Sequence, residues 1–484
     1  MRVLHFPFRA ERSNRAVMSS SIPSTAVTAP APATLKAELR ALAWLAGPLV
    51  GANLLQMAVS AVDVIFVARL GTVELAAATL GVFLFNILLY SLIGLTSAAA
   101  PIIAAELGRR AHAVREVRRS FRMALWVAAA GSVPVILILA HGETLLLLAG
   151  QNPEVADRAG AFLDIILFAV VPGVAAGVMR TTAAALGRPF WVFGVTAVAL
   201  GVAVLTNWLL VFGNWGFPAL GLEGSALASV ITMTAMMLAY ALILVTDRRL
   251  RRFRLFGRWW RTEWSRFRDI IRIGTPIMFT WFFEGALFGG AAVLMGLIGV
   301  AEVAAHAVAL NIAAVAFQIP FGIAQAATIR VGMAYGAADH AWIARAGRAA
   351  LFLGIGVMAV TATAIWLSPR LLISAYIDVN APENARVVAL AMQYLVLAAI
   401  FQLVDGAQAV GAGILRGLQD TRVPMVIAGL GYWIGGFGTA IALGFGLGWQ
   451  GVGIWTGLAV GLLCVSVLLL WRWHWRARLG MLPD

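Results

Sequence analysis

The sequence is poor in charge, in lysine and in cysteine. Only 12% of its 484 residues are charged, against about 25% in soluble domains, and 61% are hydrophobic, against about 45–50%. So few charges could not cover the surface of a soluble protein, so the composition predicts a polytopic membrane protein. The single lysine, Lys36, excludes a Walker A ATPase, a Schiff-base enzyme and a protein kinase. The single cysteine, Cys464, excludes an intramolecular disulfide and a cysteine-based metal cluster.

The basic charge of the chain is not arranged for binding nucleic acid. The net charge is +14, but the arginines cluster in short stretches between apolar runs. A membrane protein carries its orientation signal in such stretches. Because no basic domain is interleaved with aromatic residues, we expect no nucleic-acid partner.

Twelve apolar runs follow an N-terminal tail, 1–40, that we expect to be disordered and cytoplasmic. Inside hydrocarbon only helices and closed barrels satisfy the backbone, and these runs are too long and uniform for barrel strands. The expected spans are 41–68, 75–104, 123–141, 159–179, 189–212, 224–246, 270–298, 303–329, 349–367, 387–413, 424–445 and 452–471. The sequence therefore predicts an all-α membrane protein with 12 transmembrane helices.

The basic residues predict the orientation in a bacterial inner (plasma) membrane. With the N-terminus inside and the segments alternating, cytoplasmic segments hold 32 of the 36 lysines and arginines. This count places Arg180 and Arg416 in cytoplasmic loops. The periplasmic segments hold Arg69, Arg158, Arg370 and Arg386. Such a bias predicts that both termini are cytoplasmic and that the number of spans is even.

An internal repeat divides the chain into two halves. The stretch 71–77, Gly-Thr-Val-Glu-Leu-Ala-Ala, recurs at 299–305 as Gly-Val-Ala-Glu-Val-Ala-Ala, 228 residues later. The pairs Pro48 and Pro276, and Gly108 and Gly336, share that offset. Each half holds six spans, an even number, so both halves enter the membrane from the same side.

The predicted domains follow from this repeat. An N-terminal six-helix lobe, 41–246, and a C-terminal six-helix lobe, 270–471, are joined by a basic cytoplasmic linker, 247–269. A cytoplasmic tail, 472–484, follows. Parallel repeats related by an axis along the membrane normal occur in one class of secondary transporter. We expect a central cleft between the lobes, an arrangement that suits alternating access.

Four carboxylates fall inside the spans, and three of them are candidate functional groups. An ionised carboxylate in hydrocarbon costs about 2.5–3.5 kcal/mol on insertion scales, so it usually faces a cavity or a partner. Glu284 lies midway along the seventh span. It could exchange a proton or coordinate a hard cation, the alternative being a structural hydrogen bond. Its repeat counterpart, Gln56, cannot ionise. Asp164, near the outer end of the fourth span, is expected to be a solvated helix end.

The other two candidate carboxylates lie on polar faces. Asp405 shares a helix face with Gln402 and Gln408, because the three are spaced by three residues. Asp63 follows Asn53, Gln56 and Ser60 at spacings of three or four. Both faces are predicted to line water or a neighbouring helix; for Asp63 the alternative is an outer helix-end charge that faces solvent. His306, a lone histidine, is expected to be packed or hydrogen-bonded.

Several stretches resemble the MATE (multidrug and toxic compound extrusion) family in its NorM-like branch. They occur in order and in the expected helices, over about 40–480 of the chain. The matching stretches are Pro48, Gln56 and Val62-Asp63; Asn207 to Gly213 and Gly216 to Gly221; Ala304-Ala-His306 to Asn311; Ile319 to Gly332; and Leu415-Arg416-Gly417 with Asp420-Thr-Arg422.

The resemblance implies an antiporter that exports cationic, amphipathic drugs or toxic cations in exchange for Na+ or H+. It implies a cation site at Glu284 and Asp405, which could hold Na+, and a coupling role for Asp63 in the first lobe. The family's asparagine in the fifth span matches Asn207, and Asn311 is a further polar candidate. The family often has glutamine after the histidine of the eighth span. This chain has Ala307 there, which removes a ligand for sodium and leaves proton coupling open.

Further expectations are a monomer in the lipid bilayer, with no cofactor beyond the coupling ion. Because the chain has no ATP site, export would draw on an ion gradient. Two other classes stay open: a lipid-linked saccharide flippase and an intramembrane enzyme. The flippase would favour a strongly basic cavity, and no expected span has an arginine or lysine at mid-depth. An aspartyl protease would need a Gly-x-Gly-Asp type of motif and metal hydrolysis would need paired histidines, so we predict that the chain is not an enzyme.

Overall fold

The computed structural model describes residues 34–109, 113–257 and 259–483, and these residues form helices and no strand. Twelve of their helical stretches are long and apolar enough to cross a membrane. This confirms the predicted all-α fold with twelve spans. Most of the tail that we expected to be disordered, 1–40, lies outside the described residues.

Each span is one helix or a series of helical segments that continue one another. The helices of the spans are α1 (Leu35–Val67), α2 (Thr72–Thr96) with α3 (Ala99–Arg109), α4 (Val114–Leu139), α6 (Pro153–Ile166) with α7 (Val170–Ala185), α8 (Pro189–Phe212), α9 (Gly221–Thr246), α10 (Trp264–Ile298), α11 (Val300–Gly336), α12 (His340–Leu367), α14 (Ala385–Gly417), α15 (Arg422–Leu430) with α16 (Thr439–Ile441) and flanking π-helical turns, and α17 (Gln450–His474). Short helices α5 (Gly142–Leu148) and α13 (Pro369–Ser374) lie in connections.

The helices extend beyond the apolar runs, which corrects two expectations. Residues 35–40, assigned to the tail, form the start of α1, where the side chain of Thr34 accepts a hydrogen bond from the N–H of Ala37 at 3.2 Å. Arg180 and Arg416, which the loop count placed in cytoplasmic loops, belong to α7 and α14. The reason is that a helix ends where its backbone hydrogen bonds end, which need not be at the last apolar residue.

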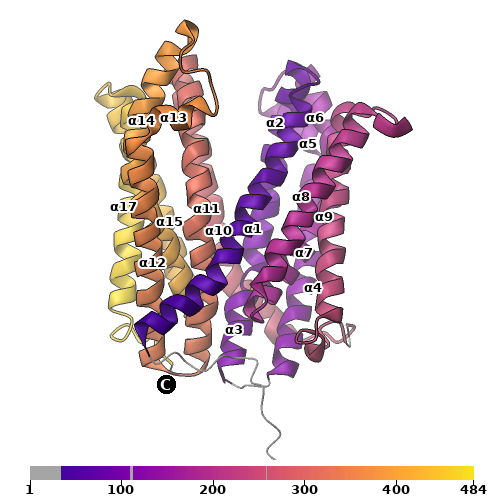
Figure 1. Ribbon diagram of the computed structural model, residues 1–484, viewed down its shortest axis with the longest axis vertical. Coiled ribbons are helices and arrows are strands. Elements are labelled where there is room, and N and C mark those ends of the chain that lie inside the picture. Colours follow the sequence, from indigo (N-terminus) through magenta and orange to yellow (C-terminus); the bar gives the residue numbers. More distant parts are fainter. Residues whose placement is uncertain (1–33, 110–112, 258, 484) are drawn as a thin grey trace, which may run out of the picture.

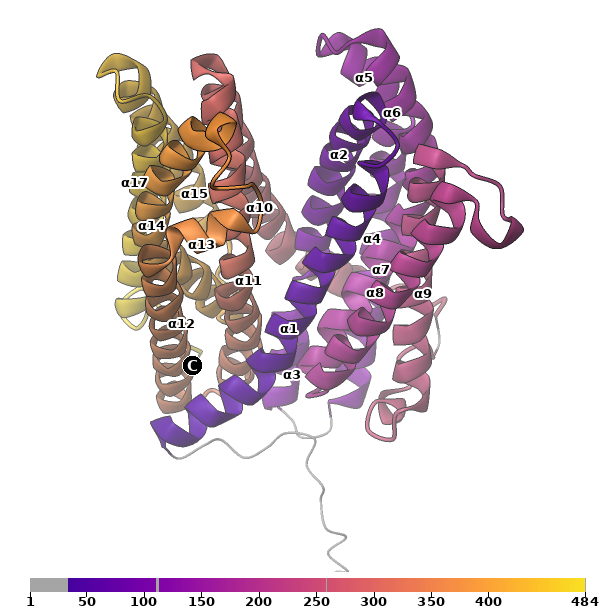
Figure 2. The ribbon, with the colours of Figure 1, turned by 45° about the horizontal axis from the view of Figure 1, so that its top comes forward.

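The helices form two lobes, which Figures 1 and 2 show from two directions. One lobe holds α2 to α9 and the other α11 to α17. The lobes converge at the end where α1 begins and the C-terminus lies, here called the terminal end, and they diverge toward the opposite end. The first helix of each half bridges the lobes: α1 packs on α8 and also on α11 and α12, and α10 packs on α2 and α4 and also on α15.

Glycines bring the two lobes into backbone contact at the terminal end. A Cβ atom on Gly108 of α3 would overlap the carbonyl of Met333 in α11, and a Cβ on Gly336 would overlap the carbonyl of Ala105 in α3. Gly108 and Gly336 are separated by the repeat offset of 228 residues, and so are their contact partners, Ala105 and Met333. The contact is therefore reciprocal, as a twofold relation between parallel repeats requires.

A second reciprocal contact obeys the same offset. A Cβ atom on Gly94 would lie 3.3 Å from the Cα of Met278, and a Cβ on Gly322 would lie 3.0 Å from the Cα of Val50. Both contacts join a helix of one lobe to the bridging helix of the other half. The structure thus confirms the two parallel six-helix repeats that the sequence predicts.

Candidate functional site

Two adjoining cavities lie where the lobes meet, and both are walled by apolar side chains. The acidic cavity, about 450 Å³, contains the side chains of Glu284 and Asp405. The basic cavity, about 160 Å³, lies nearer the terminal end and contains Arg180 but no carboxylate. The cavities share four lining residues, Tyr90, Trp281, Phe321 and Arg416. A central cleft between the lobes was predicted, and these cavities occupy that place.

The acidic cavity is bounded by α10 and α14, which bring Glu284, Asp405 and Gln408 to one wall. Asp405 and Gln408 are both 3% exposed, yet Asp405 Oδ1 and Gln408 Oε1 have no hydrogen-bond partner among the described residues. Gln402 donates from Nε2 to the carbonyl of Ala313 at 3.0 Å, and its Oε1 is also unpaired. Buried oxygens that lack donors are costly, so this face of α14 is suited to a cation or a proton donor.

Much of the remaining lining of the acidic cavity is aromatic. Besides the shared Tyr90, Trp281 and Phe321, the aromatic lining residues are Phe83, Phe282, Phe288, Phe317 and Phe401. Aromatic faces attract organic cations and bury their apolar parts. A flat, hydrophobic cation would therefore find both its charge and its body accommodated here.

Tyr432 is a candidate that the sequence did not reveal. It is fully buried in a π-helical part of the eleventh span, and its hydroxyl has no hydrogen-bond partner among the described residues. It lies within electrostatic range of Glu284, Asp405 and Arg416. π-Helical turns often mark functional sites. The only signal in the sequence was one tyrosine in a glycine-rich apolar run.

In the first lobe, Asp63 is held by neighbouring helices. Its Oδ1 accepts a hydrogen bond from Asn207 Nδ2 and its Oδ2 accepts one from the hydroxyl of Ser229, both at 2.8 Å. Asn207 is fully buried and leaves its own Oδ1 unpaired. The structure thus brings together Asp63 and Asn207, and adds Ser229, which the sequence analysis missed. None of the three lines either cavity.

The other polar residues of the first lobe lie toward the basic cavity. Gln56 lines this cavity, and Asn53, 4% exposed, accepts a hydrogen bond from Arg180 through its Oδ1. Arg180 and Arg416 line the cavity from opposite lobes. The sequence argument against a basic cavity was that no expected span contains an arginine at mid-depth. It therefore fails for the part of the central space nearer the terminal end.

Three further residues lie outside both cavities. Asn311 is exposed, and its Nδ2 donates to the carbonyl of Ala307 in its own helix at 2.8 Å. His306 is packed against Trp455 with ring centroids 5.6 Å apart, and both of its ring nitrogens are unpaired. Asp164 is exposed near the end of α6. Among the described residues no group of three histidine, cysteine, aspartate or glutamate side chains could hold a metal ion.

Ion pairs join the lobes at the terminal end, beyond the basic cavity. Glu38 of α1 is fully buried and accepts hydrogen bonds from Nε and Nη2 of Arg330 in α11, each at 2.7 Å. The indole of Trp342 donates to the same carboxylate at 3.1 Å. This arrangement satisfies a buried charge with three donors, as a dry ion pair requires.

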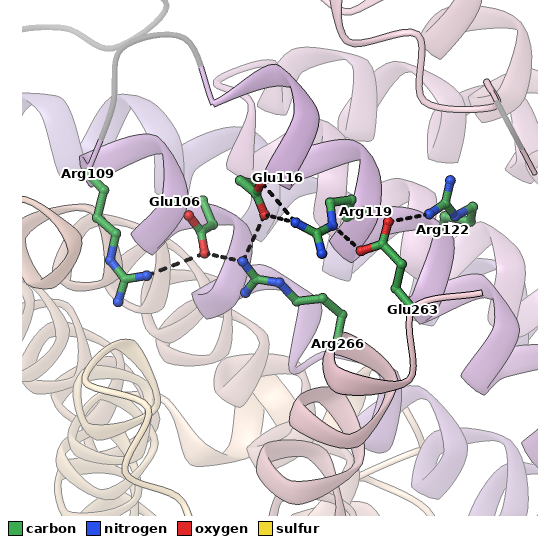
Figure 3. A network of polar contacts seen from close by, with 7 residues as sticks. All are labelled: Glu106, Arg109, Glu116, Arg119, Arg122, Glu263 and Arg266. Carbon is green, nitrogen blue, oxygen red and sulfur yellow. Dashed lines mark hydrogen bonds and ion pairs between the residues drawn. The ribbon is translucent and has the colours of Figure 1, made fainter. Parts of the chain in front are cut away.

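A second set of ion pairs, shown in Figure 3, is formed around α10. Arg266 reaches Glu106 of α3 at 2.7 Å and Glu116 of α4 at 3.0 Å. Glu263, just before α10, accepts from Arg119 and Arg122 of α4. The residues at equivalent repeat positions, Glu38 and Arg266, thus both tie a bridging helix to the other lobe, but with opposite charge.

Comparisons with known proteins agree with this architecture. A family model described as MatE matches residues 48–209 and 276–441, one stretch in each half. A probable multidrug resistance protein NorM of Mesorhizobium japonicum is 46% identical over 443 residues, which cover 92% of this chain and 95% of the relative. A probable NorM of Brucella suis is 44% identical over 433 residues, or 90% and 91% of the two chains.

Solved structures show the same fold at lower identity. The eukaryotic MATE transporter AtDTX14 superposes with a TM-score of 0.82 and 20% identity, covering 92% of this chain and 99% of that chain. Because the family model matches both halves, and the bacterial relatives match nearly the whole length, the chain belongs to the MatE family.

Proposed function

We propose that the protein is a multidrug efflux antiporter, which exports amphipathic cations in exchange for Na+ or H+. The observation that carries this proposal is the acidic cavity. Two carboxylates and two unpaired amide oxygens lie on or beside one wall, and eight aromatic side chains line much of the remainder. The relatives' names, which describe multidrug resistance proteins, support the same function. The carboxylates and these names favour the antiporter over the flippase.

Coupling would follow from competition for the carboxylates of Glu284 and Asp405. An inward-moving ion and an outward-moving organic cation cannot both be neutralised by the same pair. A ligand shifts a conformational equilibrium only by its difference in affinity for the two states. Occupation by the ion would therefore favour release of the drug, and the drug would favour release of the ion.

We further infer that the terminal end faces the cytoplasm, because the predicted cytoplasmic segments hold most of the basic residues. The conformation described, with the lobes tied together at that end, would then be the outward-facing one. Single cysteines introduced into a Cys464→Ala protein test this. Positions 213–220 and 372–380 should react with an impermeant maleimide in intact cells, and positions 250–257 should not. The reverse pattern contradicts the orientation.

Dye efflux in everted vesicles tests the proposed function. A sodium gradient and a proton gradient are imposed separately, and accumulation of a cationic dye inside the vesicles is measured under each. Accumulation that requires one of the gradients supports the antiporter. Accumulation that proceeds without any ion gradient, or none under either gradient, rejects it.

Removing one candidate ligand distinguishes sodium coupling from proton coupling. Sodium needs several oxygen ligands at once, whereas a proton needs one carboxylate. If sodium couples transport, Gln408→Ala should raise the sodium concentration for half-maximal efflux, since Gln408 Oε1 is unpaired at the acidic cavity. Asn311→Ala is the matched control, because Asn311 is exposed and lies outside the cavity. Full activity without sodium assigns the coupling to protons.

A further inference from the structure

The linker between α9 and α10 folds against the first lobe. After α9 ends, η3 (Arg251–Phe253) forms one turn of 3-10 helix that packs on α4 and α9. The apolar side chains of Leu250, Phe253 and Leu255 are turned into the protein, and none of them is more than 2% exposed. Figures 1 and 2 show the linker at the terminal end of the first lobe.

Five arginines alternate with these buried side chains and form what is here called the arginine cluster. They lie within seven residues, and all are exposed: Arg248, Arg249, Arg251, Arg252 and Arg254. None of the five forms an ion pair with any residue that the structure describes. The cluster therefore presents five guanidinium groups to the surroundings of the protein.

Other arginines near the terminal end have acceptors within the protein. Arg188 reaches Asp247 at 3.1 Å, and Arg472 donates from Nε to Asp420. A signal that only orients the chain during insertion needs the charge of such a segment and no particular folded structure. In this protein the burial of three apolar side chains holds the arginines together on one surface, which suits a partner outside the chain.

Exposed tryptophans follow the cluster along the chain. Trp259, Trp260 and Trp264 are 40%, 78% and 68% exposed. Trp126 of α4 stacks on Trp259, with ring centroids 6.4 Å apart. Tryptophans near the ends of membrane-spanning helices lie at the level of the lipid headgroups. Because Trp264 is the first residue of α10, a predicted span, these rings place the linker at that level.

We propose that the arginine cluster binds the phosphate groups of anionic phospholipids in the membrane leaflet at the terminal end. Four to eight basic residues directly beside a spanning helix attract anionic headgroups, and arginine binds phosphate through parallel hydrogen bonds. The span α9 ends at Thr246, only two residues before the cluster begins, so the guanidinium groups lie beside the headgroups. The inference concerns the lipid partner and does not depend on the transported substrate or the coupling ion.

Lipid binding to the purified, delipidated protein tests the proposal. Native mass spectrometry measures the affinity for the first molecule of phosphatidylglycerol and of phosphatidylcholine with identical acyl chains. The combined variant Arg251→Gln, Arg252→Gln and Arg254→Gln should bind phosphatidylglycerol about a hundredfold more weakly, since each basic residue near an anionic surface contributes about a factor of five. Its affinity for phosphatidylcholine should not change. The same three positions changed to lysine should restore most of the binding, because the charge is kept.

A matched control removes the same charge from other exposed positions. Arg40→Gln, Arg348→Gln and Arg422→Gln combined change one arginine each on α1, α12 and α15, and should retain the wild-type affinity for phosphatidylglycerol. An equal loss in the control and the cluster variant would show a general effect of net charge and overturn the proposal. Size-exclusion chromatography checks folding, and cysteine labelling at 372–380 checks that the variants keep the wild-type orientation.

Hydrogen exchange of the wild-type protein tests the location without any substitution. Residues 248–257 should exchange more slowly in nanodiscs of phosphatidylglycerol than in nanodiscs of phosphatidylcholine, and residues 213–220 should exchange equally in both. Equal exchange at 248–257 contradicts the proposal. Glycerol phosphate has the phosphate without the acyl chains, and it should not displace the lipid. Displacement by an equimolar amount would assign the cluster to soluble phosphates and overturn the lipid assignment.

Discussion

Asp63 of the first lobe and Asp405 of the second lobe differ in how their oxygens are satisfied. Asp63 accepts hydrogen bonds at both oxygens, from Asn207 and Ser229. Asp405 is 3% exposed and keeps one oxygen unpaired. The glycine contacts between the lobes, by contrast, are repeated almost exactly by the offset of 228. The glycine positions that the repeats share bring helices into contact, whereas Gln56 and Glu284, at equivalent repeat positions, differ in whether the side chain can ionise.

The largest expected effect is the loss of efflux when a carboxylate of the acidic cavity is replaced, compared with replacement of Asp63 in the first lobe. Glu284→Gln and Asp405→Asn should each abolish coupled efflux and ion binding while the protein remains folded, because only the charge is removed. Asp63→Asn should retain ion binding at the acidic cavity, since its own oxygens are already occupied. Ion-induced change in tryptophan fluorescence measures binding, and size-exclusion chromatography checks folding. Wild-type efflux in Glu284→Gln would disprove the cation site.

The ion pair of Glu38 with Arg330 and the ion pairs of Arg266 should contribute unequally to the free energy of unfolding. Removing one partner of a buried pair costs about 3–5 kcal/mol, because the other charge stays buried, so Glu38→Gln or Arg330→Gln should lower the melting temperature strongly. Arg266→Gln acts on partly exposed pairs, each worth about 1 kcal/mol or less. Thermal unfolding in detergent measures both. The swap Glu38→Arg with Arg330→Glu should recover part of the loss, and equal effects at Arg330 and Arg266 would contradict the distinction.

The symmetry of the glycine contacts predicts equal effects in the two halves. Gly108→Ala and Gly336→Ala each force a methyl group into the backbone of the other lobe, at a cost of about 1–3 kcal/mol by analogy with overpacked cores. Both should loosen the terminal end to a similar extent, measured as increased cysteine labelling there. Gly201→Ala is the control, because a Cβ at that position meets nothing within 4 Å. A large effect from only one of the pair would break the reciprocity.

The smallest expected effect concerns Asp247, which follows α9 and anchors the first lobe outside the membrane. Burial alone would raise its pKa, but hydrogen bonds from Trp191 and the backbone N–H of Arg249, together with Arg188, hold the pKa below its usual value of 3.8. The ionised form is therefore stabilised by folding, fully above about pH 4, and this contribution is lost as the pH falls through the lowered pKa. Asp247→Asn should lower the melting temperature slightly at pH 7, with a difference that shrinks at acidic pH. If the difference in melting temperature between the wild type and Asp247→Asn grows on acidification, the lowered pKa of Asp247 is contradicted.

Much of the fold could be predicted because hydrophobic length and repetition are properties of the sequence itself. The spans and the offset of 228 could be counted, and the structure reproduces them. The ends of the helices could not be counted in the same way. Arg180 and Arg416 were treated as loop residues because hydropathy counts an arginine as a boundary, whereas the helices continue through them.

The candidate site was predictable in part. Membrane carboxylates such as Asp405 attract attention in a sequence, because burying them is costly without a function. The hydroxyls of Ser229 and Tyr432 could not be selected from the sequence. A hydroxyl becomes informative only when the tertiary structure shows its surroundings: a hydrogen bond to Asp63 for Ser229, and a buried, unpaired position for Tyr432. Asn311 was selected as a polar residue in an apolar span, but its position around the helix axis turns it away from the cavity.

Ionic strength should act unequally on the two ties at the terminal end. In physiological salt, exposed charges are screened beyond about 8 Å, whereas dry pairs are screened much less. The pairs of Arg266 lie between side chains that are 9–26% exposed, and the pair of Glu38 with Arg330 is almost completely covered. Added salt would therefore weaken the attachment of α10 first and leave α1 bound. The two bridging helices are equivalent by repeat position, yet the contacts of α10 would be sensitive to ionic strength and those of α1 would not.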